Sequence, residues 1–184
     1  MRLARLDERG LSYIDGSLDG FWKSFFAAVL AAPLYLALVL TDMGRWQVEV
    51  GLFRLFVVSA IVYVIAWTAF PLAMYYLTKA IDREARYCLH IASYNWAQLL
   101  QYLLGFLVLV VLASSGAISE KGQDALQWAL NLAFAVYEWF IAKSALRIPG
   151  MGAAGIFVLS FLFAILMNDL RLALLGLTPQ DLAP

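Results

Sequence analysis

Five long apolar runs constrain this chain more than any other feature of its sequence. A transmembrane helix needs about 20 mainly apolar residues, because each residue rises about 1.5 Å and the hydrocarbon core is about 30 Å thick. Runs that meet this requirement lie at about residues 24–40, 55–77, 91–113, 125–146 and 152–175. The segments between them are short and turn-rich and leave no room for a soluble domain. The sequence therefore predicts an all-α polytopic integral membrane protein, a bundle of five transmembrane helices.

The composition excludes several classes of protein. Of 184 residues, 64% are hydrophobic and 14% are charged, against about 45–50% and about 25% in soluble domains. Thirteen basic and thirteen acidic residues give a net charge of zero, so no positive field is available to bind nucleic acid. One cysteine and one histidine supply neither a disulfide framework nor a cysteine-rich zinc site. We expect no cofactor and no metal.

The basic residues predict an orientation, because cytoplasmic loops of membrane proteins retain Lys and Arg. The N-terminal segment, the second loop and the fourth loop carry nine of the 13, namely Arg2, Arg5, Arg9, Lys23, Lys79, Arg83, Arg86, Lys143 and Arg147. The other four lie at the opposite ends of the spans. This asymmetry places the N-terminus in the cytoplasm and the C-terminus outside, and it favours the inner membrane of a bacterial cell as the location.

Two short segments flank the five-helix domain of residues 23–177. Residues 1–22 place apolar side chains close to one helical face, which is typical of an amphipathic helix on the cytoplasmic leaflet. Their three glycines are also compatible with a frayed terminus. Residues 178–184 form a short C-terminal tail.

Within the first span, Pro33 predicts a bend because it lacks the amide proton that a helix interior uses.

Polar side chains inside the spans are the best indicators of function. A charge at mid-span costs about 2.5–3.5 kcal/mol on insertion scales, so such residues normally face the bundle interior or water. Counting helical rise from the cytoplasmic ends places Glu138 at about 12 Å and Gln98 and Gln101 at about 10 and 15 Å. Thr68 reaches the same height. We expect one polar intramembrane cluster of Glu138, Gln98, Gln101 and Thr68, through which the third and fourth spans pack.

A second polar layer is expected further out. Asn131 lies about 23 Å and Asn168 about 24 Å from the cytoplasmic ends of their spans. Asp169 and Arg171 follow directly, and a fifth span that ends near Asn168 would leave both at the outer interface. The apolar residues 172–177 would then rest on the membrane surface.

Two interpretations of the polar set stay open. In the first, such side chains form hydrogen bonds between helices, each of which contributes about 0.6 kcal/mol to stability on average. In the second, they mark an ion or proton pathway. Glu138 fits the first interpretation least well, because a carboxyl group needs a proton, a cation or a polar partner.

The sequence contains no recognisable catalytic constellation. His90 and Cys88 are only two candidate ligands, which do not make a metal site. No Gly-x-Ser-x-Gly nucleophile motif occurs, and Glu138 has no acidic partner at its height. We therefore expect no enzymatic activity.

Several segments resemble the Yip family of small five-span membrane proteins. These are residues 75–79 (YYLTK) at the end of the second span, residues 92–96 (ASYNW) at the start of the third, and residues 148–154 (IPGMGAA) between the fourth and fifth. The resemblance covers about residues 73–170. It implies a five-span fold with a cytoplasmic N-terminus and, by analogy with members that act in membrane traffic, a partner rather than a catalyst.

Two functional hypotheses follow. The first is a non-enzymatic membrane protein that acts through contacts with helices, the lipid bilayer, a membrane-protein partner or a second copy of itself. The alternative is a small transporter, or a subunit of one, with a proton or cation site around Glu138.

Overall fold

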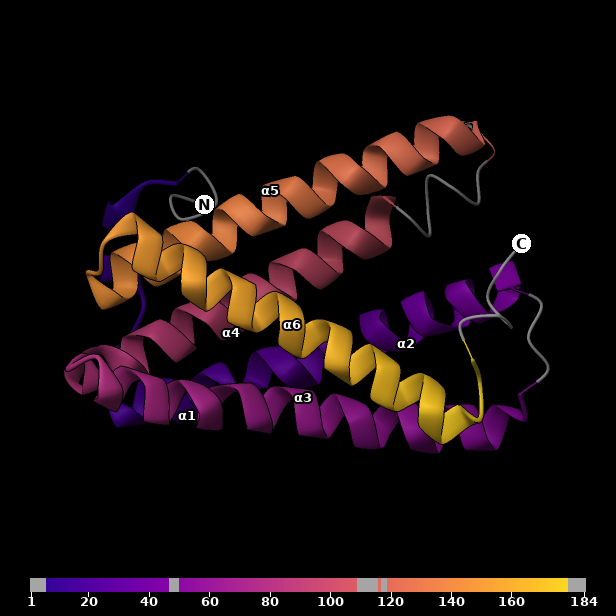
Figure 1. Cartoon of the computed structure of the whole chain (residues 1–184), viewed down its shortest axis with the longest axis horizontal. Helices are drawn as coiled ribbons and strands as arrows, with labels where there is room; N and C mark the ends of the chain where they lie inside the picture. Colours follow the sequence, from indigo (N-terminus) through magenta and orange to yellow (C-terminus); the bar gives the residue numbers. More distant parts are fainter. Residues whose placement is uncertain (1–5, 47–49, 109–115, 117–118, 179–184) are drawn as a thin grey trace.

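Helices are the regular elements of the described part of the chain. The computed structural model describes residues 6–46, 50–108, 116 and 119–178 (Figure 1). The elements, in chain order, are η2 (Glu8–Tyr13), α1 (Leu18–Ser24), α2 (Phe26–Trp46), α3 (Leu52–Ala80), η3 (Glu84–Arg86), α4 (Tyr87–Gly105), α5 (Glu120–Leu146) and α6 (Gly150–Leu175). Over these residues the all-α prediction is confirmed, and each predicted span overlaps one long helix. The predictions that concern residues 1–5, 109–115 and 179–184 lie outside the described residues.

Three helical stretches are long and apolar enough to cross a membrane. They are Leu18–Thr41, Leu52–Ala80 and Gly150–Leu175, and they identify the chain as a membrane protein. Helices α4 and α5 do not pass the same test over their described residues. Both carry amide or carboxyl side chains near their middles, which lowers the mean hydropathy of the segments.

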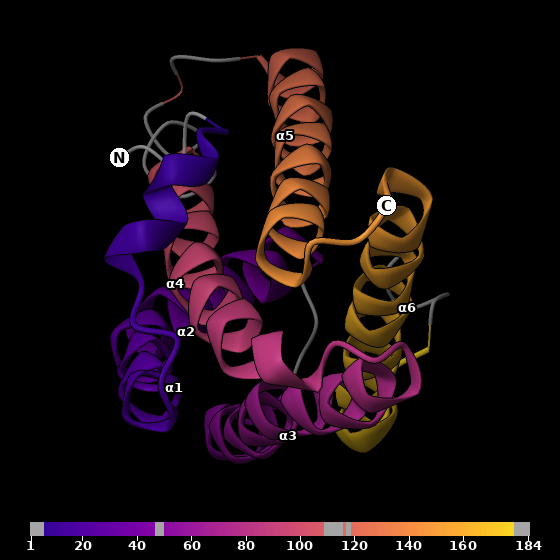
Figure 2. The same cartoon turned by 90° about the vertical axis from the view of Figure 1, so that its left-hand side faces the viewer.

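The five long helices form a closed ring. Neighbours pack in the order α2, α4, α5, α6, α3 and back to α2. Figure 2 shows the ring close to end-on, with α4 and α5 on one side and α3 on the other. Gln98 and Gln101 of α4 and Glu138 of α5 face the inside of this ring.

One end of the ring is sealed by apolar packing. Phe70, Met74, Ile91 and Leu146 are buried there in a single cluster. The N-terminal segment lies on the same end, because α1 packs against α4 and the Ser144 hydroxyl donates a hydrogen bond to a Glu8 carboxylate oxygen at 3.1 Å. The expected amphipathic N-terminal segment thus contains two short helices, η2 and most of α1, that pack on the bundle.

The turns at the sealed end are held by side-chain hydrogen bonds to backbone carbonyls. Arg86 donates to the carbonyl of Ala145 at 3.1 Å, at the end of α5, where carbonyls lack helical partners. The Trp139 indole donates to the carbonyl of Gly150 at 2.9 Å, across the turn to α6. Arg147 ends α5 in the left-handed conformation with φ of 51°. These contacts bring the second and fourth loops together with the N-terminal segment.

The first span is interrupted ahead of its proline. Helices α1 and α2 are separated at Phe25, whereas Pro33 lies inside α2.

The last helix ends at residue 175, the limit predicted for the fifth span. The expectation that it ends near Asn168 is wrong, because α6 continues to Leu175 and stops at Gly176, whose φ is 75°. Leu175 packs in a buried cluster with Val39 of α2 and Leu55 of α3. This packing holds the apolar tail inside the bundle and buries Arg171, which is 6% exposed. The level of Arg171 relative to the membrane interface stays a prediction.

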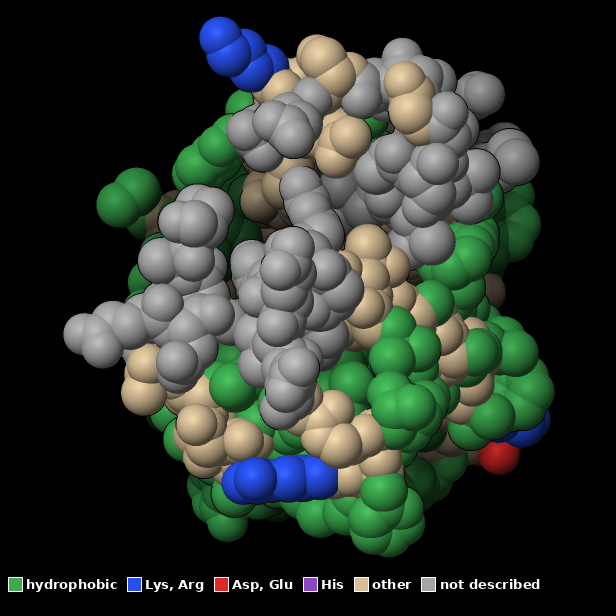
Figure 3. Space-filling model, turned by 90° about the vertical axis from the view of Figure 1, so that its right-hand side faces the viewer, with side chains coloured by type: hydrophobic (Ala, Val, Ile, Leu, Met, Phe, Trp, Pro, Cys, Tyr) green, Lys and Arg blue, Asp and Glu red, His purple; other side chains and the backbone are tan. Residues whose placement is uncertain are grey.

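The end at which α6 finishes presents mostly hydrophobic side chains among the described residues, with few charges in view (Figure 3).

Candidate functional site

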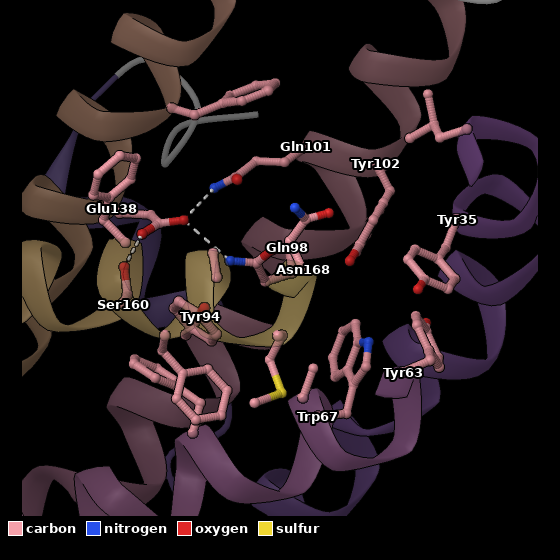
Figure 4. Close-up of a pocket in the computed structure, with 18 of the residues that line it drawn as sticks. Tyr35, Tyr63, Trp67, Tyr94, Gln98, Gln101, Tyr102, Glu138, Ser160 and Asn168 are labelled. Atoms are coloured by element: carbon pink, nitrogen blue, oxygen red, sulfur yellow. Dashed lines mark hydrogen bonds between the residues drawn. The ribbon is translucent and has the colours of Figure 1, made fainter. Parts of the chain in front are cut away.

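A carboxylate held by three neutral donors lies inside the ring. Glu138 of α5 accepts hydrogen bonds from the side-chain amides of Gln98 and Gln101 at 3.1 and 3.3 Å, both on Oε1. Its Oε2 accepts from the Ser160 hydroxyl of α6 at 2.6 Å (Figure 4). The two glutamines lie three residues apart and therefore share one face of α4. We call these four residues the carboxylate cage.

Thr68 does not join the cage. Its side chain is exposed, and its hydroxyl donates to carbonyls of its own helix, those of Val64 at 2.8 Å and Ile65 at 3.2 Å. This is the usual bond of a threonine inside a helix. Ser160, which the sequence reasoning missed, contributes the hydroxyl instead. The helical-rise count could have found it, because eight residues after Gly152 correspond to about 12 Å, the height of Glu138.

The cage faces a cavity of about 680 Å³ that all five long helices line. This volume is in the range of about 300–1,000 Å³ that small-molecule pockets occupy. Opposite Glu138 the walls are aromatic (Figure 4), formed by Tyr35, Tyr63, Trp67 and Tyr102. The rings pack on one another, with 4.9 Å between the centroids of Tyr35 and Tyr63. The Tyr63 hydroxyl is anchored by donating to the carbonyl of Ala28 at 2.6 Å.

The two asparagines of the predicted outer layer line the same cavity, but each bonds within its own helix. Asn131 accepts from the amide of Gln127 at 3.0 Å. Asn168 accepts from the guanidinium of Arg171 at 2.9 Å. Arg171 also lines the cavity, and its three-residue spacing from Asn168 was the available signal for this pair.

Asn95 contributes a buried polar atom to the cavity wall. Its amide donates to the Ser24 hydroxyl at 2.9 Å, which in turn donates to the carbonyl of Phe21 at 2.7 Å. Its carbonyl oxygen Oδ1 is buried without a hydrogen-bond partner in the described part of the chain.

The remaining candidate ligands lie away from the cavity. His90 is 1% exposed, and neither ring nitrogen has a partner among the described residues. Cys88 is half-buried. Neither residue lines the cavity, and a search of the described residues finds no group of three or more His, Cys, Asp or Glu side chains placed to hold a metal.

The cage can hold a positive charge. No cationic side chain among the described residues bonds to Glu138, and the cavity is lined by tyrosine and tryptophan side chains, a residue class that attracts cations, organic ammonium groups above all. No family model matches the chain, and the comparisons with curated proteins and with solved structures find no match either.

Proposed function

We propose that the protein is a non-enzymatic five-span protein of the bacterial inner membrane, and that it is a small transporter or transporter subunit whose proton or cation site is Glu138. The observation that carries the proposal is the carboxylate cage, which faces a cavity of about 680 Å³ and in which no cationic side chain among the described residues bonds to Glu138.

The cavity favours transport over a purely structural use of the polar residues. Interhelical contacts need only amides and hydroxyls, such as the Asn95–Ser24 pair. Protein interiors are otherwise close-packed, with few voids larger than a water molecule. Glu138 is half-buried and faces the cavity, which is the arrangement that an ion or proton pathway requires.

The packing at the sealed end supports the proposed orientation. The contacts of Arg86 with Ala145 and of Ser144 with Glu8 join three basic segments at one end of the ring. Because cytoplasmic segments retain basic residues, this end is the cytoplasmic one in our proposal. The cavity lies further out along the helices.

The test is flux into liposomes that contain the purified protein. We would follow uptake of protons and of a short alkylammonium ion for the wild type, for Glu138→Gln and for the control Thr68→Val, which changes a polar residue outside the cage. Expected are flux in the wild type and the control and its loss in Glu138→Gln. Equal flux in all three proteins, or no flux in a correctly folded wild type, would contradict the proposal.

A second candidate function is partner binding, which the resemblance to the Yip family also favours. A specific observation supports it on α6, where a side chain added at Gly155 would meet nothing within 4 Å and Met151 is 86% exposed. Small residues on a lipid-facing helix allow another helix to approach closely. Gly155→Cys in a Cys88→Ser background should then give a disulfide-linked dimer or adduct, and Val64→Cys on α3, which is also exposed, is the control.

A further inference from the structure

We propose that the cavity binds an elongated zwitterion, with an ammonium group at the Glu138 end and a carboxylate or similar anion at the Arg171 end. This inference rests on the proposed function and names the class of substrate.

Two opposite charges line one cavity without neutralising each other. Glu138 is held by amides and a hydroxyl, and Arg171 has Asn168 as its hydrogen-bond partner. The ion pair found among the described side chains lies elsewhere, between Lys23 and Asp19. Buried charges in proteins are normally paired or bound to a ligand. The cavity thus has two charged ends, each suited to a group of the opposite sign.

The length of α6 gives the scale of the ligand. Ser160 touches the Glu138 carboxylate, and Arg171 follows eleven residues later, which corresponds to about 16 Å along a helix. Long side chains on helices lean towards the N-terminus, which brings the guanidinium closer to the cage. This spacing is too large for a direct ion pair and suits one molecule with charges at its two ends.

The walls between the two ends fit an ammonium group on an apolar chain. Tyr63, Trp67 and Tyr102 line the stretch opposite the cage (Figure 4). Aromatic faces stabilise both a cation and an apolar chain.

The experiment is a titration of the full-length protein in detergent with straight-chain α,ω-amino acids of increasing length. Each is compared with its methyl ester, which keeps the ammonium group and removes the negative charge, and with the n-alkylamine of equal length. We expect the affinity to peak at one chain length, where the amino acid binds at least about tenfold more tightly than its ester. Glu138→Gln should weaken all three ligands, and Arg171→Gln should abolish only the advantage of the free acid.

The esters keep the test informative even where Arg171→Gln fails to fold. Equal affinity of acid and ester at every length would overturn the inference and leave the cation site of the proposed function intact. A folded Arg171→Gln protein that retains the preference for the acid would overturn the inference in the same way. Absence of binding by alkylamines as well as amino acids, together with absence of flux, would overturn both proposals.

Discussion

The two ends of the helix ring differ in how they fill their interior. At the sealed end, large apolar side chains from several helices meet, and Met74, Ile91 and Leu146 are fully or almost fully buried. Further along the same helices, amides, hydroxyls and tyrosines line a cavity of about 680 Å³. The helices are continuous between the two regions, so the difference arises from the side chains they present.

This contrast separates stability from binding. Close packing at the sealed end stabilises the bundle through van der Waals contacts between its helices, and it holds the loops and the N-terminal segment together. Around the cavity the side chains are less closely packed, and the polar groups there remain available to a ligand. Substitutions in the two regions should therefore have different consequences.

The largest difference is expected from two methionines. Met74→Ala removes a side chain that is 0% exposed in the sealed cluster and should lower the free energy of unfolding by about 2–5 kcal/mol. Met167→Ala changes a half-buried residue that already borders the cavity and should cost less than about 1 kcal/mol. The free energies of unfolding of both variants, measured in mixed micelles, test this difference. Equal losses would show that the two regions are packed alike.

Two glycines, Gly20 buried in α1 and Gly155 exposed on α6, sharpen the comparison. A Cβ at Gly20 would lie 2.1 Å from the carbonyl oxygen of Asp15, so Gly20→Ala must displace the N-terminal segment and should cost about 1–3 kcal/mol. Gly155→Ala meets nothing within 4 Å and should be neutral or stabilising by up to about 1 kcal/mol. Thermal unfolding of the purified variants checks both values. A harmless Gly20→Ala would mean that the segment does not pack as described.

Two double-mutant cycles compare hydrogen bonds in the two settings. The pair of Ser160 and Glu138 includes an ionisable carboxyl group, and its coupling should be about 1.5 kcal/mol or more when that group is ionised. The neutral pair of Ser24 and Asn95 should couple by about 0.6 kcal/mol. The first cycle combines Ser160→Ala with Glu138→Gln, and the second combines Ser24→Ala with Asn95→Ala. A weaker coupling for the Ser160 pair would indicate that Glu138 is uncharged.

The smallest expected effect is a pH dependence at the N-terminal segment. The backbone amide of Ser17 donates to the Asp15 carboxylate at 2.9 Å, and this bond lowers the pKa of Asp15 below its ordinary value of 3.8. Because the pKa of Asp15 is lowered in the folded state, its contribution to the free energy of unfolding is complete above pH 3.8. This contribution is lost as the pH falls through the folded-state pKa. An NMR titration of the Ser17 amide measures the midpoint. A midpoint at or above 3.8 would contradict this contact, and Asp15→Asn should remove the transition.

The helices and the centre of the site could be predicted from the sequence because both depend on local properties. Apolar length predicts each long helix, and the helical rise placed Gln98, Gln101 and Glu138 at one height. Height alone does not say which side of a helix a residue faces. For this reason Thr68 was grouped with the cage although its side chain is exposed on α3.

Arg171 could not be placed from the sequence because its position depends on contacts far along the chain. Leu175 packs against Val39 and Leu55, and these contacts hold the end of α6 in the bundle. The closed order of the ring is also a property of the whole fold, so no single segment indicates that Arg171 and Glu138 line the same cavity.

The Ser160 hydroxyl gives the site a means of adjusting to its contents. It lies 2.6 Å from the Glu138 carboxylate and 3.1 Å from the carbonyl of Phe157, yet a hydroxyl has one proton to donate. When a bound cation takes over the carboxylate oxygen, Ser160 can rotate its proton to its own helix and lose no hydrogen bond. Loading and emptying the site then require one hydroxyl rotation, with no movement of the backbone.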